Sequence, residues 1–496
     1  MLFHTWIFAV FLLIVWPAYM ALRRTRFRTP LLLVASYVFY GWWNCLYLLL
    51  IAWSTLIDWT MVVLMGRFRR PWARRLFLFG SVANNVALLS QFKYASFLID
   101  SLNALLGWAG SAWMLRAPGV VWPPGITHVA EQLSALLTPL TAWLGIPGPP
   151  ATLSLLLPVG ISFYTFQSMS YTIDFFRGRV EKEPSLLRFA TFVSLFPQLV
   201  AGPIERARNL LPQLRTPPPV RLADVTDGLS MFVVGLFKKV AIADYLAMYV
   251  DEVYKLPGDQ GAPALLLATV AFSWQIYFDF SGYTDMARGA ARMMGFRLML
   301  NFNSPYLADS LGDFWSRWHI SLSTWFRDYF YVPLGGNRKG KARTYVNMVL
   351  TMLISGLWHG AAWTFVAWGA FHAAGRAMTR GLEATDFYRR RIPRILKQLL
   401  VFAFVTFAWI FFRAGSIEDA WAVISGIFTG PWIDPRCPVW AMALIVAVWA
   451  YQFAFESRLR PLLRLAPVRV GLVILMILYL AILPGGQDQP FIYFQF

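Results

Sequence analysis

The chain has 496 residues, of which 58% are hydrophobic and only 14% are charged. Charged residues make up about a quarter of an ordinary soluble domain, so this composition excludes one and indicates a membrane protein. The formal net charge of +19 would suggest a nucleic-acid partner in a soluble protein, but here the basic residues gather in short segments between apolar runs. That distribution is the positive-inside pattern of cytoplasmic loops. The two cysteines, Cys45 and Cys437, indicate neither a metal site nor a disulfide framework.

Apolar runs of about 17–25 residues, long enough to cross a bilayer, recur along almost the whole chain. We expect an all-α polytopic membrane protein with about ten to twelve membrane elements. Neither an internal repeat nor a soluble linker divides it, so we expect a single domain over residues 1–496. In chain order, the expected apolar segments are residues 5–22, 30–43, 46–65, 76–92 with an extension to about 108, 153–175, 225–250, 262–287, 345–375, 398–413, 420–430, 438–455 and 470–484.

The ends of these segments carry further expectations. Residues 5–22 lack a basic leader and a cleavage site, and arginines follow them, so we expect a retained span with its N-terminus outside. Proline and glycine interrupt the segment 153–175, and residues 196–203 are short and broken enough to predict a re-entrant element. Residues 109–150 fit an excursion on the non-cytoplasmic side, and residues 204–221 predict a basic, proline-rich cytoplasmic loop.

The polar chemistry of the chain is densest between residues 313 and 341, around His319. Polar groups are costly to bury in a membrane, so such a cluster is a functional-site hypothesis. We expect two ion pairs here, Asp313 with Arg317 and Arg327 with Asp328. A continuous helix would carry an aromatic stripe, which is more typical of packing than of a ligand site; the stripe is Trp315, Trp318, Leu322, Trp325 and Tyr329. Asp279 and Asp285 are expected to be structural partners of arginines such as Arg288, Arg292 or Arg317.

A second histidine, His359, lies in the sequence SGLWHGAAW. The motif contains a G-x-x-x-G pair, Gly356 and Gly360, which favours close approach of a neighbouring helix. On a continuous helix, His359 would share a face with Ser355 and Trp363, and His372 would lie about 140° away. His359 suits a general base near neutral pH, but a neutral histidine bonded between packed helices is an equally good interpretation. The remaining histidines, His4, His128 and His372, are assigned no function.

The glycine-rich loop at residues 335–341 nearly matches a phosphate-binding P-loop. Ala342 stands where that motif needs serine or threonine, which excludes an NTPase. The basic residues of the loop suit either the phosphates of an anionic substrate or a cytoplasmic anchor; they are Arg338, Lys339, Lys341 and Arg343. No metal site is expected, because His319 and His359 are 40 positions apart without a further histidine or cysteine ligand nearby. A serine hydrolase lacks its G-x-S-x-G motif.

These motifs resemble the membrane-bound O-acyltransferase (MBOAT) family, above all in WHISLSTWFRDYFYVPLGGNRKG (318–340) and SGLWHGAAWTFVAWG (355–369). The likeness extends over nearly the whole chain and is closest to the bacterial branch that serves alginate O-acetylation. Further stretches carry it: LLLVASYVFYGWW (31–43), LPVGISFYTFQSMSYTIDFFRG (157–178), FPQLVAGPIERA (196–207), YFDFSGYTDMARGAARMMGF (277–296), FFRAGSIEDA (411–420) and FIYFQF (491–496).

The resemblance implies a ring of transmembrane helices around a funnel, with broken and re-entrant helices at its centre. It implies that His359 is the catalytic histidine and His319 the second active-site residue. Other residues of the two motifs are then expected to line the site: Trp315, Trp318, Ser323, Trp325, Ser355, Trp358 and Trp363. Acyl transfer from a thioester needs a base and an oxyanion donor. We therefore expect His359 to take the proton of the acceptor, and His319 to bond the thioester carbonyl or orient His359.

The resemblance also implies the reaction. Acetyl-CoA would be the cytoplasmic donor, with its phosphates near the basic loop, and no cofactor would stay bound. The acceptor would be an exported polysaccharide such as alginate, reached from the bacterial inner membrane through a periplasmic partner of the SGNH type. Peptidoglycan, teichoic acid, cellulose or a secreted metabolite are alternative acceptors. A transporter would be expected to show inverted repeats, which the sequence lacks, and intact histidine motifs make a non-catalytic scaffold less attractive.

Overall fold

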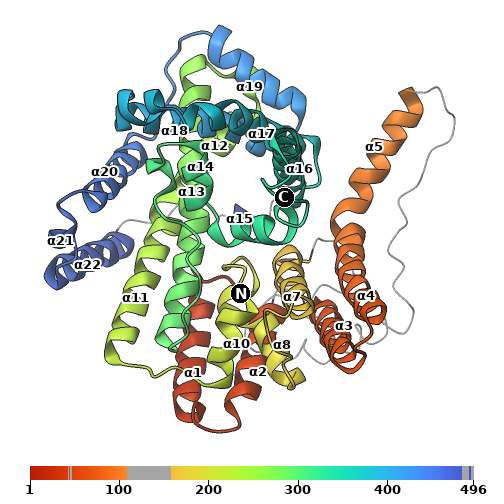
Figure 1. Ribbon diagram of the computed structural model, residues 1–496. Helices are drawn as coiled ribbons and strands as arrows, with labels where there is room; N and C mark the ends of the chain where they lie inside the picture. Colours follow the sequence, from red (N-terminus) through yellow and green to blue (C-terminus); the bar gives the residue numbers. More distant parts are fainter. Residues whose placement is uncertain (43, 45–46, 109–157, 483–490, 493–496) are drawn as a thin grey trace. The chain divides into compact units, whose positions relative to one another are not determined.

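The computed structural model describes residues 1–42, 44, 47–108, 158–482 and 491–492. Its regular secondary structure is helical throughout these residues, which confirms the all-α class for them (Figure 1). They form two compact units, the first from Met1–Arg221 with Met294–Leu298 and the second from Leu222–Met293 with Met299–Phe496. The single domain over residues 1–496 stays a prediction, and the excursion expected at residues 109–150 lies outside the described residues.

Four helices in the described ranges are long and apolar enough to cross a membrane. They are α3, α13, α18 and α20, with bounds Tyr47–Arg67, Ala262–Met293, Arg394–Arg413 and Val439–Glu456. Two shorter apolar helices, Trp6–Leu22 and Ala466–Ile482, add to them. The structure therefore supports a membrane protein, while the count of about ten to twelve elements and the ring around a funnel stay predictions.

The first unit follows the expected order of segments. Its helices are α1 Trp6–Leu22, α2 Arg28–Gly41, α3, α4 Pro71–Leu89, η1 Ser90–Tyr94, α5 Ala95–Trp108, α7 Ile161–Phe176, α8 Leu186–Ser194, α9 Phe196–Leu199 and α10 Ala207–Arg215. The predicted interruption before residue 161 is confirmed, because Gly160 adopts a left-handed conformation (φ 77°) and α7 begins after it. The loop predicted at residues 204–221 is wrong for residues 207–215. There α10 forms by burying Leu210, Leu211 and Leu214 on one face.

A buried polar cluster joins three helices of the first unit. Asp58 on α3 accepts hydrogen bonds from Ser81 Oγ at 2.6 Å and from Asn85 Nδ2 at 2.9 and 3.0 Å, both on α4. Ser168 on α7 donates a further bond to the same carboxylate. A buried carboxylate is tolerated only when such donors surround it, so the cluster fixes how α3, α4 and α7 pack.

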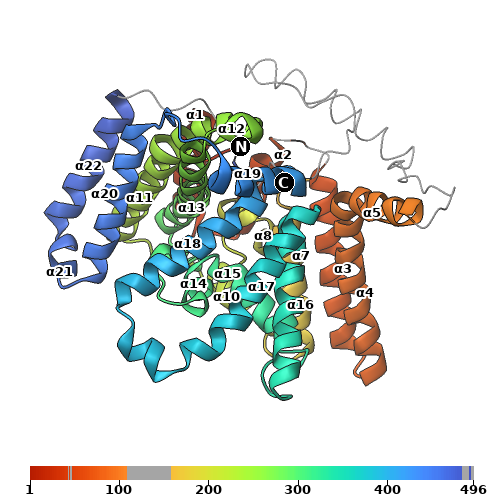
Figure 2. The same ribbon diagram turned by 90° about the horizontal axis from the view of Figure 1, so that it is seen from above.

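The second unit is organised around α13. Its other helices are α11 Leu222–Phe237, η2 Lys238–Ala243, α12 Asp244–Lys255, η3 Pro257–Asp259, η4 Pro305–Leu307, α14 Leu311–Arg317, α15 Ile320–Phe326, η5 Arg327–Tyr331, α16 Lys341–His359, α17 Trp363–Glu383, η6 Phe387–Arg391, α18, α19 Ile417–Thr429, α20, α21 Arg460–Leu463 and α22 Ala466–Ile482. Helix α13 packs against α11, α12, α18 and α19, and α16 packs along α17 (Figures 1 and 2). Most of the α13 side chains are buried, so it forms the centre of this unit's core.

Charged side chains are buried in this core as pairs. Lys239 Nζ lies 2.7 Å from Asp244 Oδ1 and 2.8 Å from Asp279 Oδ1. The arginine partner predicted for Asp279 is therefore wrong, because a lysine from the neighbouring π-helix η2 reaches it first. The prediction for Asp285 is confirmed, since Arg288 Nη1 lies 3.8 Å away, although Lys238 Nζ is closer at 2.6 Å. Lys239, Asp244 and Asp279 thus form a buried group in which opposite charges lie beside one another, as a low-dielectric interior favours.

Candidate active site

The turn between α14 and α15 carries His319. Ser310 caps the start of α14 by accepting a hydrogen bond from the Asp313 amide at 3.1 Å. The helix ends at Arg317, and His319 adopts a left-handed conformation (φ 41°, ψ 55°) that restarts the chain as α15. A continuous helix through this region is therefore wrong, and so is the single aromatic stripe expected on it. A non-glycine residue in this conformation costs about 1–3 kcal/mol and persists only where its surroundings hold it.

Asn301 is the residue that holds His319. The Asn301 carbonyl oxygen accepts a backbone bond from Ile320 at 2.8 Å, and Asn301 Oδ1 lies 3.0 Å from His319 Nδ1. The same Oδ1 accepts from the amide and hydroxyl of Ser321 at 3.3 and 2.9 Å. Because that amide can only donate, Oδ1 is the acceptor, and His319 Nδ1 must carry a hydrogen. The lone pair of the neutral ring is then on Nε2.

Burial fixes the charge of this ring. His319 is 1% exposed. Desolvation lowers its pKa to about 3, because removing water disfavours the charged imidazolium. Its ring packs edge-to-face against Phe280, with centroids 4.7 Å apart. At the pH of a cell His319 is therefore a neutral imidazole that presents Nε2 as a hydrogen-bond acceptor or a base.

The second histidine lies at the bend of a helical hairpin. Helix α16 ends at His359, Gly360 and Ala362 are extended, and α17 begins at Trp363. The continuous helix predicted over residues 345–375 is therefore wrong. The close approach predicted from the G-x-x-x-G pair is confirmed, since a Cβ on Gly356 would lie 2.2 Å from the Phe365 carbonyl oxygen. The Phe365 ring also packs over Gly360, which holds the two helices together at the bend.

An aromatic shell surrounds His359, which is 3% exposed. Its ring centroid lies 5.1 Å from Trp358, 5.2 Å from Trp368 and 5.3 Å from Phe412. Trp358 also packs against His319, with centroids 6.1 Å apart. The fold therefore brings the two histidines of the two motifs to the same tryptophan, although 40 positions separate them in the sequence.

A third histidine lies next to this shell. His372 is fully buried, and its ring packs against Trp368 at 4.8 Å and Trp315 at 5.0 Å. In the described part of the chain neither of its ring nitrogens has a hydrogen-bond partner. The sequence analysis placed His372 away from His359 because it assumed one continuous helix. Since the chain bends at residues 360–362, Trp368 contacts both histidine rings.

Three other predicted lining residues, Trp318, Ser323 and Trp325, make different contacts. Trp318 packs on Trp409 at 5.0 Å, and Ser323 Oγ donates to the Trp318 carbonyl at 3.1 Å. Trp325 packs on Tyr329 at 5.1 Å, further along the same segment. Trp358 is thus the predicted lining residue placed against both histidines.

Two of the predicted residues flank the hairpin bend, and a third packs on Trp368 of α17. Ser355 is buried on α16, whereas Trp363 is 58% exposed at the start of α17. Trp315, on α14, lies against Trp368, with centroids 5.7 Å apart. The aromatic shell therefore takes residues from α14, α16, α17 and α18.

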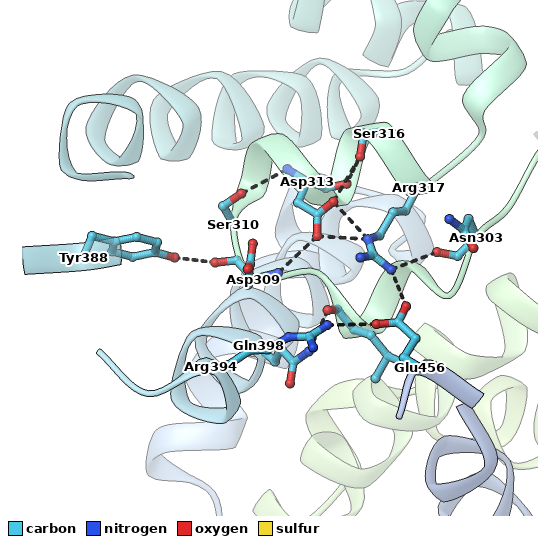
Figure 3. Close-up of polar contacts among 11 residues, drawn as sticks. Asn303, Asp309, Ser310, Asp313, Ser316, Arg317, Tyr388, Arg394, Gln398 and Glu456 are labelled. Carbon is cyan, nitrogen blue, oxygen red and sulfur yellow. Dashed lines mark hydrogen bonds and ion pairs between the residues drawn. The ribbon is translucent and has the colours of Figure 1, made fainter. Parts of the chain in front are cut away.

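Ion pairs surround the start of the His319 segment (Figure 3). Arg317 Nε lies 2.9 Å from both oxygens of Asp313, and Arg327 Nε lies 2.8 Å from Asp328 Oδ1, so both predicted pairs are confirmed. Arg317 also bonds Glu456 at the end of α20, which the sequence analysis did not single out. No signal in the motif itself points to Glu456, because the two residues are 139 positions apart.

The basic loop after η5 is exposed. Gly335, Gly336 and Gly340 adopt positive φ angles, and Asn347 Nδ2 holds the loop by donating to the Gly336 carbonyl at 3.0 Å. Arg338 and Lys339 of the loop, and Lys341 and Arg343 of the first turn of α16, are exposed to solvent. Within the described ranges, no group of three or more histidine, cysteine, aspartate or glutamate side chains is placed to hold a metal ion.

Comparison with known proteins identifies the family. The model of the MBOAT, membrane-bound O-acyltransferase, family matches residues 176–414. A protein of Pseudomonas putida named probable alginate O-acetylase AlgI is 37% identical over 98% of this chain and 99% of its own length. Its namesake in Pseudomonas aeruginosa is 40% identical over 85% of this chain and 75% of its own length.

Relatives with another acceptor are more distant. The peptidoglycan O-acetyltransferase of Helicobacter pylori is 34% identical over 80% of this chain and 73% of its own length. The matched residues contain both histidines, the turn that carries His319 and the hairpin that carries His359. The chain therefore belongs to the membrane-bound O-acyltransferase family and is an O-acyltransferase.

Proposed function

We propose that this O-acyltransferase takes acetyl groups from cytoplasmic acetyl-CoA and supplies them for O-acetylation of an exported, alginate-like polysaccharide. The observation that carries this proposal is the likeness to probable alginate O-acetylases over nearly the whole chain. We propose the bacterial inner membrane as its location and a periplasmic protein of the SGNH type as the partner that completes the transfer. The relative from Helicobacter pylori makes peptidoglycan the alternative acceptor.

Both histidines are proposed to be catalytic. A thioester reacts with a hydroxyl when a base removes the hydroxyl proton and a donor stabilises the oxyanion that forms. The hydrogen bond between Asn301 and His319 supports an accepting role for His319, because its lone pair is on Nε2. This reverses the division of roles predicted from the sequence. A neutral His359 has one N–H in either tautomer and can donate it to the thioester carbonyl.

The basic loop is proposed to attract the phosphates of CoA. Its four exposed cations would form a positive surface that raises the local concentration of an anionic donor. The test is the variant R338Q/K339Q/K341Q/R343Q, for which we expect the KM for acetyl-CoA to rise about threefold or more, and most strongly at low salt. The variant R458Q/R460Q/R464Q is the matched control, because it removes exposed arginines near α21. Equal KM values in all three proteins would contradict the loop assignment.

The proposed donor and acceptor are tested together. Full-length protein in membrane vesicles would be supplied with radiolabelled acetyl-CoA and either alginate or peptidoglycan fragments, with and without periplasmic extract. We expect labelled O-acetyl groups on alginate and a requirement for the extract. Label on peptidoglycan alone would identify peptidoglycan, and not alginate, as the acceptor. If no acceptor is labelled while a related enzyme is active in the same assay, acetyl-CoA is contradicted as the donor.

A further inference from the structure

Arg317, two residues before His319, is the centre of an ion-pair network that crosses the second unit (Figure 3). Besides Asp313, its guanidinium bonds Glu456, with Arg317 Nη1 2.6 Å from Glu456 Oε1. The other carboxylate oxygen of Glu456 accepts from Arg394 Nη2 at 2.8 Å, at the start of α18. Two carboxylates and two guanidinium groups thus balance in charge and connect α14, α18 and α20.

The backbone connects this network to His319. The Arg317 carbonyl oxygen accepts a bond from the Asn303 amide at 3.0 Å, and the Ile320 amide donates to the Asn301 carbonyl at 2.8 Å. The segments 301–303 and 317–320 are therefore paired on both sides of His319. Asn301, which bonds the His319 ring, belongs to the same pairing. A movement of Arg317 would consequently move both the backbone and the partner of His319.

The pairing has to hold a costly conformation. His319 is left-handed without being glycine, and such a residue relaxes unless neighbouring contacts oppose it. Most exposed ion pairs stabilise little, but the side chains of Arg317 and Glu456 are only 17% and 24% exposed. Charge-assisted bonds to a forked guanidinium are also directional, so they fix position as well as charge.

We propose that Glu456 is a positioning residue for His319. Through Arg317 it holds the paired segments that keep His319 left-handed and its Nε2 oriented for the reaction. Glu456 lies beyond residues 176–414, so the family match does not point to it. The inference rests on the proposed catalytic role of His319 and names a residue, on another helix, on which that role depends.

The test is the isosteric variant E456Q in the full-length protein. Its matched control is D386N, which removes a carboxylate from an ion pair whose side chains are 81% and 84% exposed. We expect E456Q to lower kcat for acyl transfer about tenfold or more while the KM for acetyl-CoA stays unchanged, because misplacing a reacting group affects the chemical step. We expect E456D, which keeps the charge, to recover part of the loss, and D386N to behave as wild type.

A second readout does not depend on activity. Diethyl pyrocarbonate modifies accessible histidines, and peptide mass spectrometry locates each modified ring. We expect E456Q to accelerate modification of His319 several-fold while His372 stays protected, because only the turn between α14 and α15 is released. Modification of all histidines at once would indicate general unfolding and overturn the positioning role. Wild-type kcat together with wild-type protection of His319 would overturn it as well.

The two readouts separate this inference from the proposed function. If wild type is active and H319A is equally active, the catalytic role of His319 fails, whatever E456Q does. If H319A is inactive and E456Q is fully active, the catalytic role stands and the positioning role fails. If no protein transfers acyl groups, the modification of His319 still decides whether Glu456 holds the turn.

Discussion

The two catalytic candidates are held in place by different forces. Hydrogen bonds accepted by Asn301, together with paired backbone segments, fix the turn that carries His319, and they determine which ring nitrogen has the lone pair. Aromatic rings and a glycine contact hold His359 at a helical bend. We therefore expect substitutions that change polarity to disturb the His319 region most, and substitutions that change side-chain volume to disturb the His359 region most.

Removing either imidazole should have the largest effect. We expect H319A and H359A each to lower kcat about 10²- to 10⁴-fold, the usual contribution of a general acid or base. The measurement is acyl transfer in membrane vesicles with matched expression, with H4A as a control for the loss of a histidine outside the two motifs. An effect of less than threefold in either variant would remove that histidine from the reaction.

Variants of Asn301 test whether polar contacts hold His319. We expect N301A to lower kcat about 10- to 100-fold, because it releases the His319 ring and its tautomer. N301D keeps the acceptor and adds a negative charge, which raises the pKa of His319.

The sign of the pH effect follows from these two pKa values. The wild-type pKa of about 3 predicts that protonation of His319 causes no loss of kcat between pH 5 and pH 8. In N301D, kcat should remain substantial near pH 8 and fall as the pH drops through the raised pKa. Identical pH profiles of kcat for wild type and N301D would contradict the tautomer assignment.

The variant G356A tests whether close packing holds the bend that carries His359. A Cβ there would collide with the Phe365 carbonyl oxygen, so G356A should force α16 and α17 apart and lower the unfolding free energy by about 1–3 kcal/mol. G381A is the control on the other helix of the hairpin, since a Cβ on Gly381 of α17 meets nothing within 4 Å. Thermal unfolding in detergent should show a lower midpoint for G356A alone. A shared midpoint would mean that the bend does not depend on this contact.

Substitutions of His372 should have the smallest effect, and they test whether this residue only packs or also takes part in the reaction. If it only fills the aromatic shell, H372F keeps a planar ring, slightly larger than imidazole, and should change the unfolding free energy by less than about 1.5 kcal/mol, with activity near wild type. H372A should destabilise more, because it leaves a cavity. A large loss of kcat in a stable H372F protein would instead show that the ring nitrogens take part in the reaction.

Local sequence signals predicted the parts of this molecule that depend on neighbouring residues. The helical class, the two ion pairs and the close approach at Gly356 followed from composition and spacing. The breaks at His319 and Gly360 did not, because each is made by contacts with residues outside the local helical pattern, namely Asn301 and the Phe365 ring.

The sequence analysis did not predict partners distant in the chain, for the same reason. Glu456 reaches Arg317 across 139 positions, and nothing in its own surroundings in the sequence marks it. His372 was assigned no function because an uninterrupted helix would direct it away from His359. Trp368 and His372 lie one turn apart on α17, and the bend brings Trp368 against His359.

The most direct test of this account is single-turnover transfer from radiolabelled acetyl-CoA in membrane vesicles containing wild type, H319A, H359A, N301A and N301D. The account predicts fast transfer by wild type, very slow transfer by both histidine variants, and slow transfer by N301A with recovery in N301D at alkaline pH. Equal rates in wild type, H319A and N301A would contradict it, because neither the base nor the residue that fixes its tautomer would then matter to the reaction.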